Sequence, residues 1–349
     1  MSLTFLIPGA LDQLTGGYLY DRQVVDGLRR QGRTVQVIEL PGQHPAADAT
    51  ACTAAASALA ALPDGATAVI DGLALPAFAA CLAEHAARLQ LIGFIHHPLS
   101  LETGLTPAEA RQLASLEARL WQQLHGALCP SAHTARALVA AGLADDRVAV
   151  VKPGTLKPAQ IPARQHNGPL QLLAVGTVTP RKGHLLLVNA LAGLQDFDWH
   201  LTCIGSLTRD PAAAAALQAA IHSQGLSDRL TLRGEQPAAS LTAAYQAADV
   251  FVLPSHHEGY GMVYAEALAH GLPVIATTAG AIPDTVPAEA SLLVLPGDTA
   301  ALREALRRLL SDAPLRQRLA AGALRAAPTL PDWDHTVRNW AAALEWLTE

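Results

Sequence analysis

The sequence has few cysteines, few aromatic residues and no concentration of charge of one sign. Only four cysteines occur among 349 residues, and none are spaced as a CxxC pair, so a disulfide framework and a zinc site are both disfavoured. Lys and Arg number 24 against 30 Asp and Glu, a net charge of −6, and this balance excludes the basic footprint of a nucleic-acid-binding protein. Such sparse cysteines are typical of a reducing compartment, and we expect a cytoplasmic protein.

Long apolar runs are also absent. The first apolar stretch, residues 3–7, breaks at Pro8 and Gly9 and is too short for a signal peptide or a membrane span. No strongly basic amphipathic stretch marks a membrane-surface helix. We therefore expect no integral membrane contact, while peripheral contact stays open.

What the chain does contain is apolar mass, since half of its residues are hydrophobic. Its length exceeds the roughly 250–300 residues at which single cores stop growing, so we expect two domains. Short apolar runs alternate with Ala/Leu-rich stretches long enough for helices, which is typical of doubly wound parallel sheets. The expected strands are residues 4–7, 34–39, 68–71, 91–96, 127–130, 148–151, 170–175, 199–204, 230–233, 250–254, 274–277 and 291–294.

A proline-rich segment separates the two sets of strands. Residues 152–169 contain four prolines and two glycines, and proline lacks the backbone donor that sheets and helix interiors need. We therefore expect two Rossmann-like domains at 1–157 and 170–330, joined by a linker at 158–169. A final amphipathic helix at 331–349 is expected to pack back toward the N-terminal domain.

The most informative polar residues lie in the segment 251–285. An apolar strand ends at Pro254, Glu258 follows in a loop, and a helix is expected to begin near Met262 with Glu266 inside it. The N-terminus of that helix offers free N–H groups to an anion. Carboxylates on both sides of an anion site favour a ligand that is anionic in its middle and rich in hydroxyls at its ends, such as a nucleoside diphosphate sugar.

A second polar loop follows the strand expected at 170–175. Gly176 opens the turn, and Arg181 and Lys182 precede Gly183 and another helix. Arg offers a bidentate fork and Lys a compact point charge, so the pair can balance a diphosphate. A solvated loop is the alternative for these two cations taken alone.

The segments VGTVTPRKG, EGYGMVYAE and IPDTV together resemble the retaining glycosyltransferases of family 4 over about residues 170–296. The resemblance implies GT-B architecture, in which two Rossmann-like domains face a cleft, with the acceptor side in the first domain and the donor site in the second.

The same resemblance implies roles for individual residues. Glu258 would contact the hydroxyls of the donor sugar and Glu266 those of the ribose. Arg181 and Lys182 would hold the diphosphate, assisted by backbone amides of the loop and helix start at Gly261, Met262 and Val263.

The first domain offers weaker signals. Gly16 and Gly17 come after the first strand and just before a helix, where they would let the backbone approach a donor phosphate or an acceptor; a plain turn is an equal alternative. His96 and His97 close the strand expected at 91–96. The family often has a histidine there that contacts the donor sugar, and His96 matches it, whereas His97 departs from the pattern and a buried structural histidine stays the alternative.

No metal ligand is expected. Asp196 and Asp198 precede a strand, Asp332 and Asp334 start a helix where Asp is a common cap, and the pair at 256–257 lacks a third ligand nearby. We expect a metal-independent hexosyltransferase that needs no cofactor and uses a nucleotide sugar donor and an unknown acceptor, and the resemblance to family 4 implies that it is retaining. A sugar phosphorylase, a sugar-nucleotide epimerase of the same architecture and a non-catalytic nucleotide-sugar binder stay as alternatives.

Overall fold

The computed structural model describes residues 3–161 and 168–349, which form two compact units. Unit 1 runs to Gly154 and resumes at Pro331, while unit 2 comprises Thr155–Leu330. The division after Gly154 falls within the proline-rich segment 152–169. Part of the predicted linker, residues 162–167, lies outside the described residues.

Each unit is built on a six-stranded sheet in which all neighbouring strands pair in parallel. Every predicted strand is present, with ends shifted by at most two residues. In unit 1 the order is β2-β1-β3-β4-β5-β6, with β1 (Leu3–Pro8), β2 (Val35–Leu40), β3 (Thr67–Asp71), β4 (Gln90–Phe94), β5 (Gly126–Cys129) and β6 (Val148–Val150). In unit 2 it is β12-β11-β10-β7-β8-β9, with β7 (Leu170–Val175), β8 (Trp199–Ile204), β9 (Leu230–Leu232), β10 (Val250–Val252), β11 (Val274–Thr277) and β12 (Ser291–Val294).

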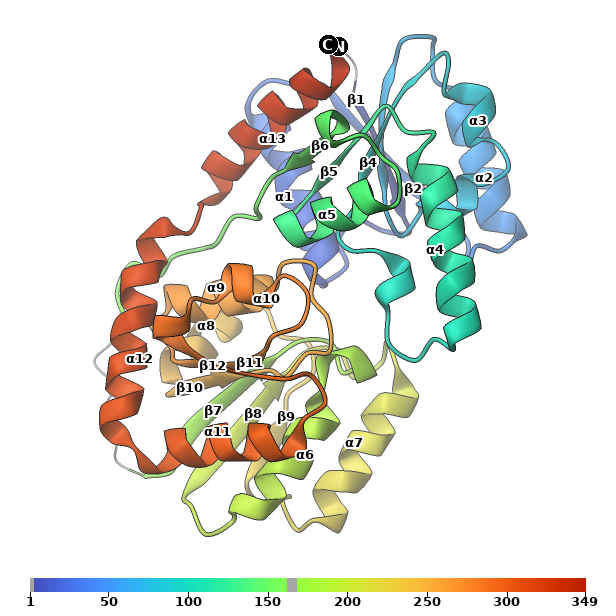
Figure 1. Cartoon of the computed structure of the whole chain (residues 1–349). Helices are drawn as coiled ribbons and strands as arrows, with labels where there is room; N and C mark the ends of the chain where they lie inside the picture. Colours follow the sequence, from blue (N-terminus) through green and yellow to red (C-terminus); the bar gives the residue numbers. More distant parts are fainter. Residues whose placement is uncertain (1–2, 162–167) are drawn as a thin grey trace. The chain divides into compact units, whose positions relative to one another are not determined.

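Helices cover both faces of each sheet (Figure 1). Those of unit 1 are α1 (Gly16–Arg30), α2 (Ala49–Ala60), α3 (Leu82–His85), α4 (Pro107–Trp121), α5 (Ala132–Ala140) and α13 (Trp333–Thr348). Those of unit 2 are α6 (His184–Leu191), α7 (Pro211–Ser223), α8 (Ala238–Ala247), α9 (Met262–Ala269), α10 (Ile282–Thr285), α11 (Thr299–Ser311) and α12 (Ala313–Ala326). Many start at a side chain that accepts a hydrogen bond from the first turn and so satisfies an otherwise orphaned N–H; these caps are Asp48, Thr106, Ser131, Asp210, Asp298, Asp312 and Asp332.

The two faces of the unit 1 sheet bury different side chains, because successive strand residues point to opposite sides. On one face Phe5 stacks on Trp340 of α13 with ring centroids 5.4 Å apart. On the other, Leu6 joins the apolar cluster formed with α2, α3, α4 and α5. Helix α13 packs beside α1 (Figure 1), and the close approach requires Gly27, where a Cβ would collide with Val337.

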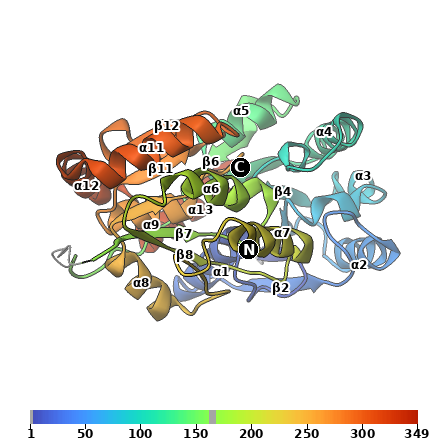
Figure 2. The same ribbon diagram turned by 90° about the horizontal axis from the view of Figure 1, so that it is seen from below.

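Unit 2 has one continuous core between its sheet and its helices. Helices α7, α6 and α11 lie side by side on one face of the sheet (Figure 2). No helix of the described ranges 3–161 and 168–349 is both long enough and apolar enough to cross a membrane.

Each sheet has a point where the strand order reverses. In unit 1 this point lies between β1 and β3, and in unit 2 it lies between β7 and β10. In open α/β sheets, ligands bind outside the carboxyl ends of the strands at such a switch point. The residues that follow β1, β3, β7 and β10 are therefore the candidates for a ligand-binding site.

Candidate functional site

Glu258 lies in the loop after β10 and is buried. Its carboxylate accepts hydrogen bonds from Lys182 Nζ at 2.6 Å, the Ser255 hydroxyl at 2.7 Å and Arg181 Nη1 at 3.3 Å. Burial alone would raise the pKa of Glu258, but the charges of Lys182 and Arg181 lower it to about 2. The side chain is therefore a fixed carboxylate throughout the physiological range.

The loops after β7 and β10 are held together at the switch point of unit 2. The His256 N–H donates to the Arg181 carbonyl at 2.7 Å, and Arg181 Nη1 donates to the His257 carbonyl at 2.9 Å. Gly183, which ends the short turn carrying both cations, has φ +72°, and a Cβ there would collide with the Pro254 carbonyl. The glycine thus lets two loops meet that a larger residue would separate.

A third loop, after β11, holds the backbone of the loop that carries Glu258. The Ala281 N–H donates to the Glu258 carbonyl at 2.9 Å, and the Thr277 hydroxyl donates to the Ser255 carbonyl at 2.6 Å. Gly280, with φ +58°, packs so closely that a Cβ would collide with the Glu258 carbonyl. The carboxylate is thus set by three loops at the carboxyl edge of the sheet.

Helix α9 begins at Met262, as predicted, after Gly261 in the left-handed conformation with φ +87°. Met262 and Val263 occupy its first turn, where N–H groups have no intrahelical acceptor. Glu266 lies in the same helix, and its Oε2 accepts a hydrogen bond of 2.8 Å from the Tyr245 hydroxyl.

The two glutamates differ in charge. Burial raises the pKa of Glu266 to about 7, although the hydrogen bond from Tyr245 opposes the rise, whereas Glu258 stays ionised. Two carboxyl groups whose surroundings give them such different pKa values are suited to different tasks. Tyr245 and Ser255 were not predicted from the sequence: Tyr245 lies 21 residues before its partner Glu266, whereas Ser255 lies only three residues before Glu258 in a loop where the sequence does not fix side-chain direction.

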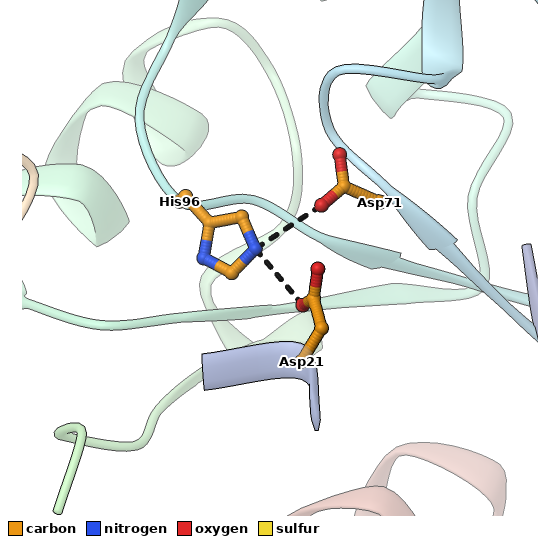
Figure 3. A group of neighbouring side chains, drawn as sticks. All are labelled: Asp21, Asp71 and His96. Carbon is orange, nitrogen blue, oxygen red and sulfur yellow. Dashed lines mark hydrogen bonds and ion pairs between the residues drawn. The ribbon is translucent and has the colours of Figure 1, made fainter. Parts of the chain in front are cut away.

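In unit 1, His96 lies two residues beyond the end of β4, not within the strand as predicted. Its Nε2 is 3.0 Å from Asp21 Oδ1 and 3.2 Å from Asp71 Oδ2 (Figure 3). Burial would lower the pKa of His96, but the two carboxylates, Asp21 first, raise it to about 10. The imidazole is therefore a cation at neutral pH.

The two aspartates come from the elements that flank the switch point of unit 1. Asp71 is the last residue of β3, and Asp21 lies in α1, which follows β1. Burial raises the pKa of Asp21 to about 7, partly offset by His96. Burial also acts to raise the pKa of Asp71, but the hydrogen bond and charge of His96 lower it overall.

Sequence analysis missed both aspartates, although signals were present. Asp21 falls on a buried stripe of α1 with Val24 and Leu28, and Asp71 closes a fully buried strand. An acidic residue within an apolar stripe seldom occurs without a partner. The polar atoms of Asp21, Asp71 and His96 lie within 4.8 Å of one another, close enough to hold a metal ion. The 3.0 and 3.2 Å separations from His96 Nε2 are equally those of hydrogen bonds.

The remaining predicted residues of unit 1 lie beside this group or at its edge. Gly16 and Gly17 are the first two residues of α1, not a loop before it. A Cβ on Gly17 would lie 3.3 Å from the His96 ring, so this glycine makes room for the imidazole. His97 Nε2 lies 3.4 Å from Glu102 Oε2. The Asp332 cap is as predicted, accepting from the His335 N–H at 2.7 Å.

Comparison with known proteins supports the predicted family. Residues 169–312 match the family model described as glycosyl transferases group 1. The D-inositol 3-phosphate glycosyltransferase of Xylanimonas cellulosilytica is 36% identical over 206 residues, covering 54% of this chain and 49% of that protein. The 2-deoxystreptamine glucosyltransferase of Streptomyces kanamyceticus is 36% identical over 160 residues, covering 45% of this chain and 41% of that protein. The chain thus spans about half the length of the curated relatives it matches.

Solved structures resemble the chain over nearly its whole length. Sucrose-phosphate synthase from Thermosynechococcus elongatus superposes with a TM-score of 0.82 at 21% identity, covering 99% of this chain and 98% of that one. Anabaena Alr3699/HepE in complex with UDP-glucose gives a TM-score of 0.75 at 19% identity, covering 99% of each. At such identities the likeness establishes the fold alone. The chain therefore has the GT-B fold of two doubly wound parallel sheets, and its segment 169–312 matches the model of the glycosyl transferases group 1 family.

Proposed function

We propose that this protein is a glycosyltransferase that moves a sugar from a nucleoside diphosphate sugar to an acceptor hydroxyl. One observation carries the proposal: a permanently ionised carboxylate, Glu258, is fixed by two cations at the switch point of unit 2. Such a group accepts hydrogen bonds from sugar hydroxyls, and charged acceptors make the stronger bonds.

The charge around Glu258 suits a diphosphate. Lys182 and Arg181 together carry two positive charges against one negative, which leaves one positive charge in the cluster. We assign Lys182 and Arg181 to the diphosphate, whose negative charge grows as the bond to the sugar stretches.

Helix α9 would supply further contacts to the nucleotide sugar. The first-turn N–H groups of Met262 and Val263, after Gly261, lie at the positive end of the α9 dipole and would add to the phosphate site. Glu266, oriented by Tyr245, would accept from the ribose hydroxyls. In unit 1, His96 would contact the substrate, with Gly16 and Gly17 allowing close approach of the backbone.

Because cations and helix N–H groups of the chain meet the leaving charge, we propose that transfer needs no divalent metal and no cofactor. We also propose retention of configuration and transfer of a hexosyl group, as the family 4 resemblance implies. Since a related fold was solved with UDP-glucose, a UDP-hexose is the donor to test first. The named relatives are a D-inositol 3-phosphate glycosyltransferase and a 2-deoxystreptamine glucosyltransferase, so D-inositol 3-phosphate and 2-deoxystreptamine are the first acceptors to test.

The proposal is tested by ligand-induced stabilisation followed by turnover. A sugar nucleotide present at 100 times its dissociation constant should stabilise the protein by about 2.7 kcal/mol, so UDP-, GDP- and ADP-sugars can be ranked by thermal shift. Release of the free nucleotide should then require an acceptor hydroxyl. Release only with inorganic phosphate would indicate a phosphorylase, and conversion of the donor without release an epimerase. Stabilisation without turnover across an acceptor library would indicate a binding protein.

A further inference from the structure

One nitrogen of His96 is shared by two carboxylates from different elements. Nε2 lies 3.0 Å from Asp21 Oδ1 and 3.2 Å from Asp71 Oδ2, and the side chains of these aspartates are only 1% and 3% exposed. The single hydrogen on Nε2 points between two acceptors inside the protein. No substrate oxygen can use that atom without breaking a buried, charge-assisted bond.

The other ring nitrogen is left for a ligand. Figure 3 shows Nδ1 on the side of the ring away from both carboxylates, and the His96 side chain, at 14% exposure, is the most accessible of the three. We propose that Asp21 and Asp71 are positioning residues that hold His96 as a proton-bearing donor, with Nδ1–H as the group that meets a substrate oxygen. The inference rests on the proposed glycosyltransferase function and adds the orientation and charge of its histidine.

The surroundings hold the ring in this orientation. Phe94 and Tyr20 pack against His96 with ring centroids 4.7 and 5.9 Å away, and Gly17 lies against its edge. Among the groups that face the imidazole, the charged ones are Asp21 from α1 and Asp71 from β3; the aromatic neighbours carry no charge. The two acidic groups therefore favour the charged form of the ring, and the aromatic neighbours fix its plane.

This arrangement excludes His96 as a general base. A base must lose its proton near the working pH, whereas the carboxylates raise the pKa of His96 to about 10. Burial likewise raises the pKa of the Asp21 carboxyl, and the three groups titrate as one coupled set whose pKa values belong to the set as a whole.

The first test reads the ring directly in the full-length wild-type protein. Nitrogen-15 NMR of the imidazoles, with the His96 signals assigned through a His96→Gln variant, should report both ring nitrogens protonated from pH 6 to 9. A neutral ring at pH 7.5 would overturn the proposal. This readout needs no substrate, so it separates failure of this inference from failure of the proposed function.

The second test uses the double variant Asp21→Asn, Asp71→Asn. Burial then acts on the pKa of His96 unopposed and lowers it below its usual 6.5, so the ring becomes neutral at pH 8. We expect kcat/KM at pH 8 to fall about 100-fold, as for loss of one preorganised charged donor, and to recover as pH is lowered through the new pKa. Glu102→Gln, which alters the carboxylate beside His97, is the matched control and should leave the His96 signals unchanged.

Other results would contradict the inference. If the double variant loses the same activity at pH 6 and at pH 8, the two aspartates have a purely structural role. In that case Asp71→Glu, which keeps the negative charge, should not restore activity either. Should the double variant fail to fold, the wild-type titration still decides. Stabilisation of the wild type by Zn²⁺ or Mn²⁺ that is abolished by Asp21→Asn would show that a cation, and not the imidazolium, holds the two carboxylates.

Discussion

Replacing Glu258 by glutamine removes one buried negative charge and leaves Lys182 and Arg181 facing each other without it. In the folded protein the pKa of Glu258 is lowered from 4.5 to about 2. One pKa unit is worth about 1.4 kcal/mol, so this difference corresponds to about 3 kcal/mol of stability at neutral pH. In a domain of about 150–250 residues each kcal/mol shifts Tm by about 2–4 °C, and we expect the variant to melt about 6–12 °C below the wild type.

The pH dependence of this difference has a defined sign. A depressed carboxyl pKa contributes stability that is complete above the unfolded value of 4.5 and is lost as pH falls through about 2. The gap in Tm between wild type and variant should therefore be constant from pH 6 to 9 and narrow only below pH 4.5. Calorimetric melting at several pH values measures it.

A matched control is available in the pair formed by Glu304 and Arg307. That pair has comparable distances, with Arg307 Nη2 2.7 Å from Glu304 Oε1, but both side chains are about half exposed, and exposed pairs contribute little. Glu304→Gln should leave Tm unchanged. If both variants melted like the wild type, the energetic account of the Glu258 cluster would be wrong.

The same Glu258→Gln variant should also lose turnover, by about 10²–10³-fold, as when one preorganised charge-stabilising group is removed. Affinity for the free nucleotide should change little, since Glu258 is assigned to the sugar. Normal turnover at a temperature where the variant is folded would refute the assignment of this residue to the donor.

Three further predictions concern neighbouring features. Glu266→Gln should weaken UDP and UDP-sugar binding alike. The pKa of Glu266 is raised to about 7, and the carboxylate is the form we expect to accept hydrogen bonds from ribose. Wild-type affinity measured by calorimetry should therefore fall from pH 8 to pH 6, while that of the variant should not. Gly280→Ala should lower Tm and activity more than Gly225→Ala, because both glycines have positive φ but only the first would drive a Cβ into the Glu258 carbonyl. Turnover should persist in excess EDTA, and a loss that manganese or magnesium restores would contradict the metal-independent proposal.

Strands and the residues that follow them were predictable because their signals are local. Parallel strands buried on both faces appear as short apolar runs, and loops at their carboxyl ends are where ligands bind. This logic placed Arg181 and Lys182 on the loop after one strand and Glu258 on the loop after another. It could not reveal that Lys182 Nζ lies 2.6 Å from Glu258 across 76 residues of chain, so the sequence predicted a binding role for Glu258 and not the buried ion pairs that this residue forms.

The aspartates around His96 were beyond sequence patterns for a related reason. Asp21 and His96 are 75 residues apart, and only the parallel order of the strands brings α1, β3 and the end of β4 to one place. A helix period identifies Asp21 as buried, but not the group that compensates its charge. Partner identity is a property of topology, which a single sequence does not determine.

The return of the chain to unit 1 has a consequence for synthesis on the ribosome. Unit 2 is one continuous stretch, Thr155–Leu330, whereas unit 1 needs Pro331–Glu349 as well as its first 154 residues. Until α13 has been made, Phe5 lacks the Trp340 ring that covers it, and Gly27 of α1 lacks its contact with Val337. At about 5–20 residues per second, the ribosome needs roughly 10 to 40 s to make the 195 residues from 155 to 349. The N-terminal part of unit 1 therefore stays incompletely covered until the last residues of the chain have been made.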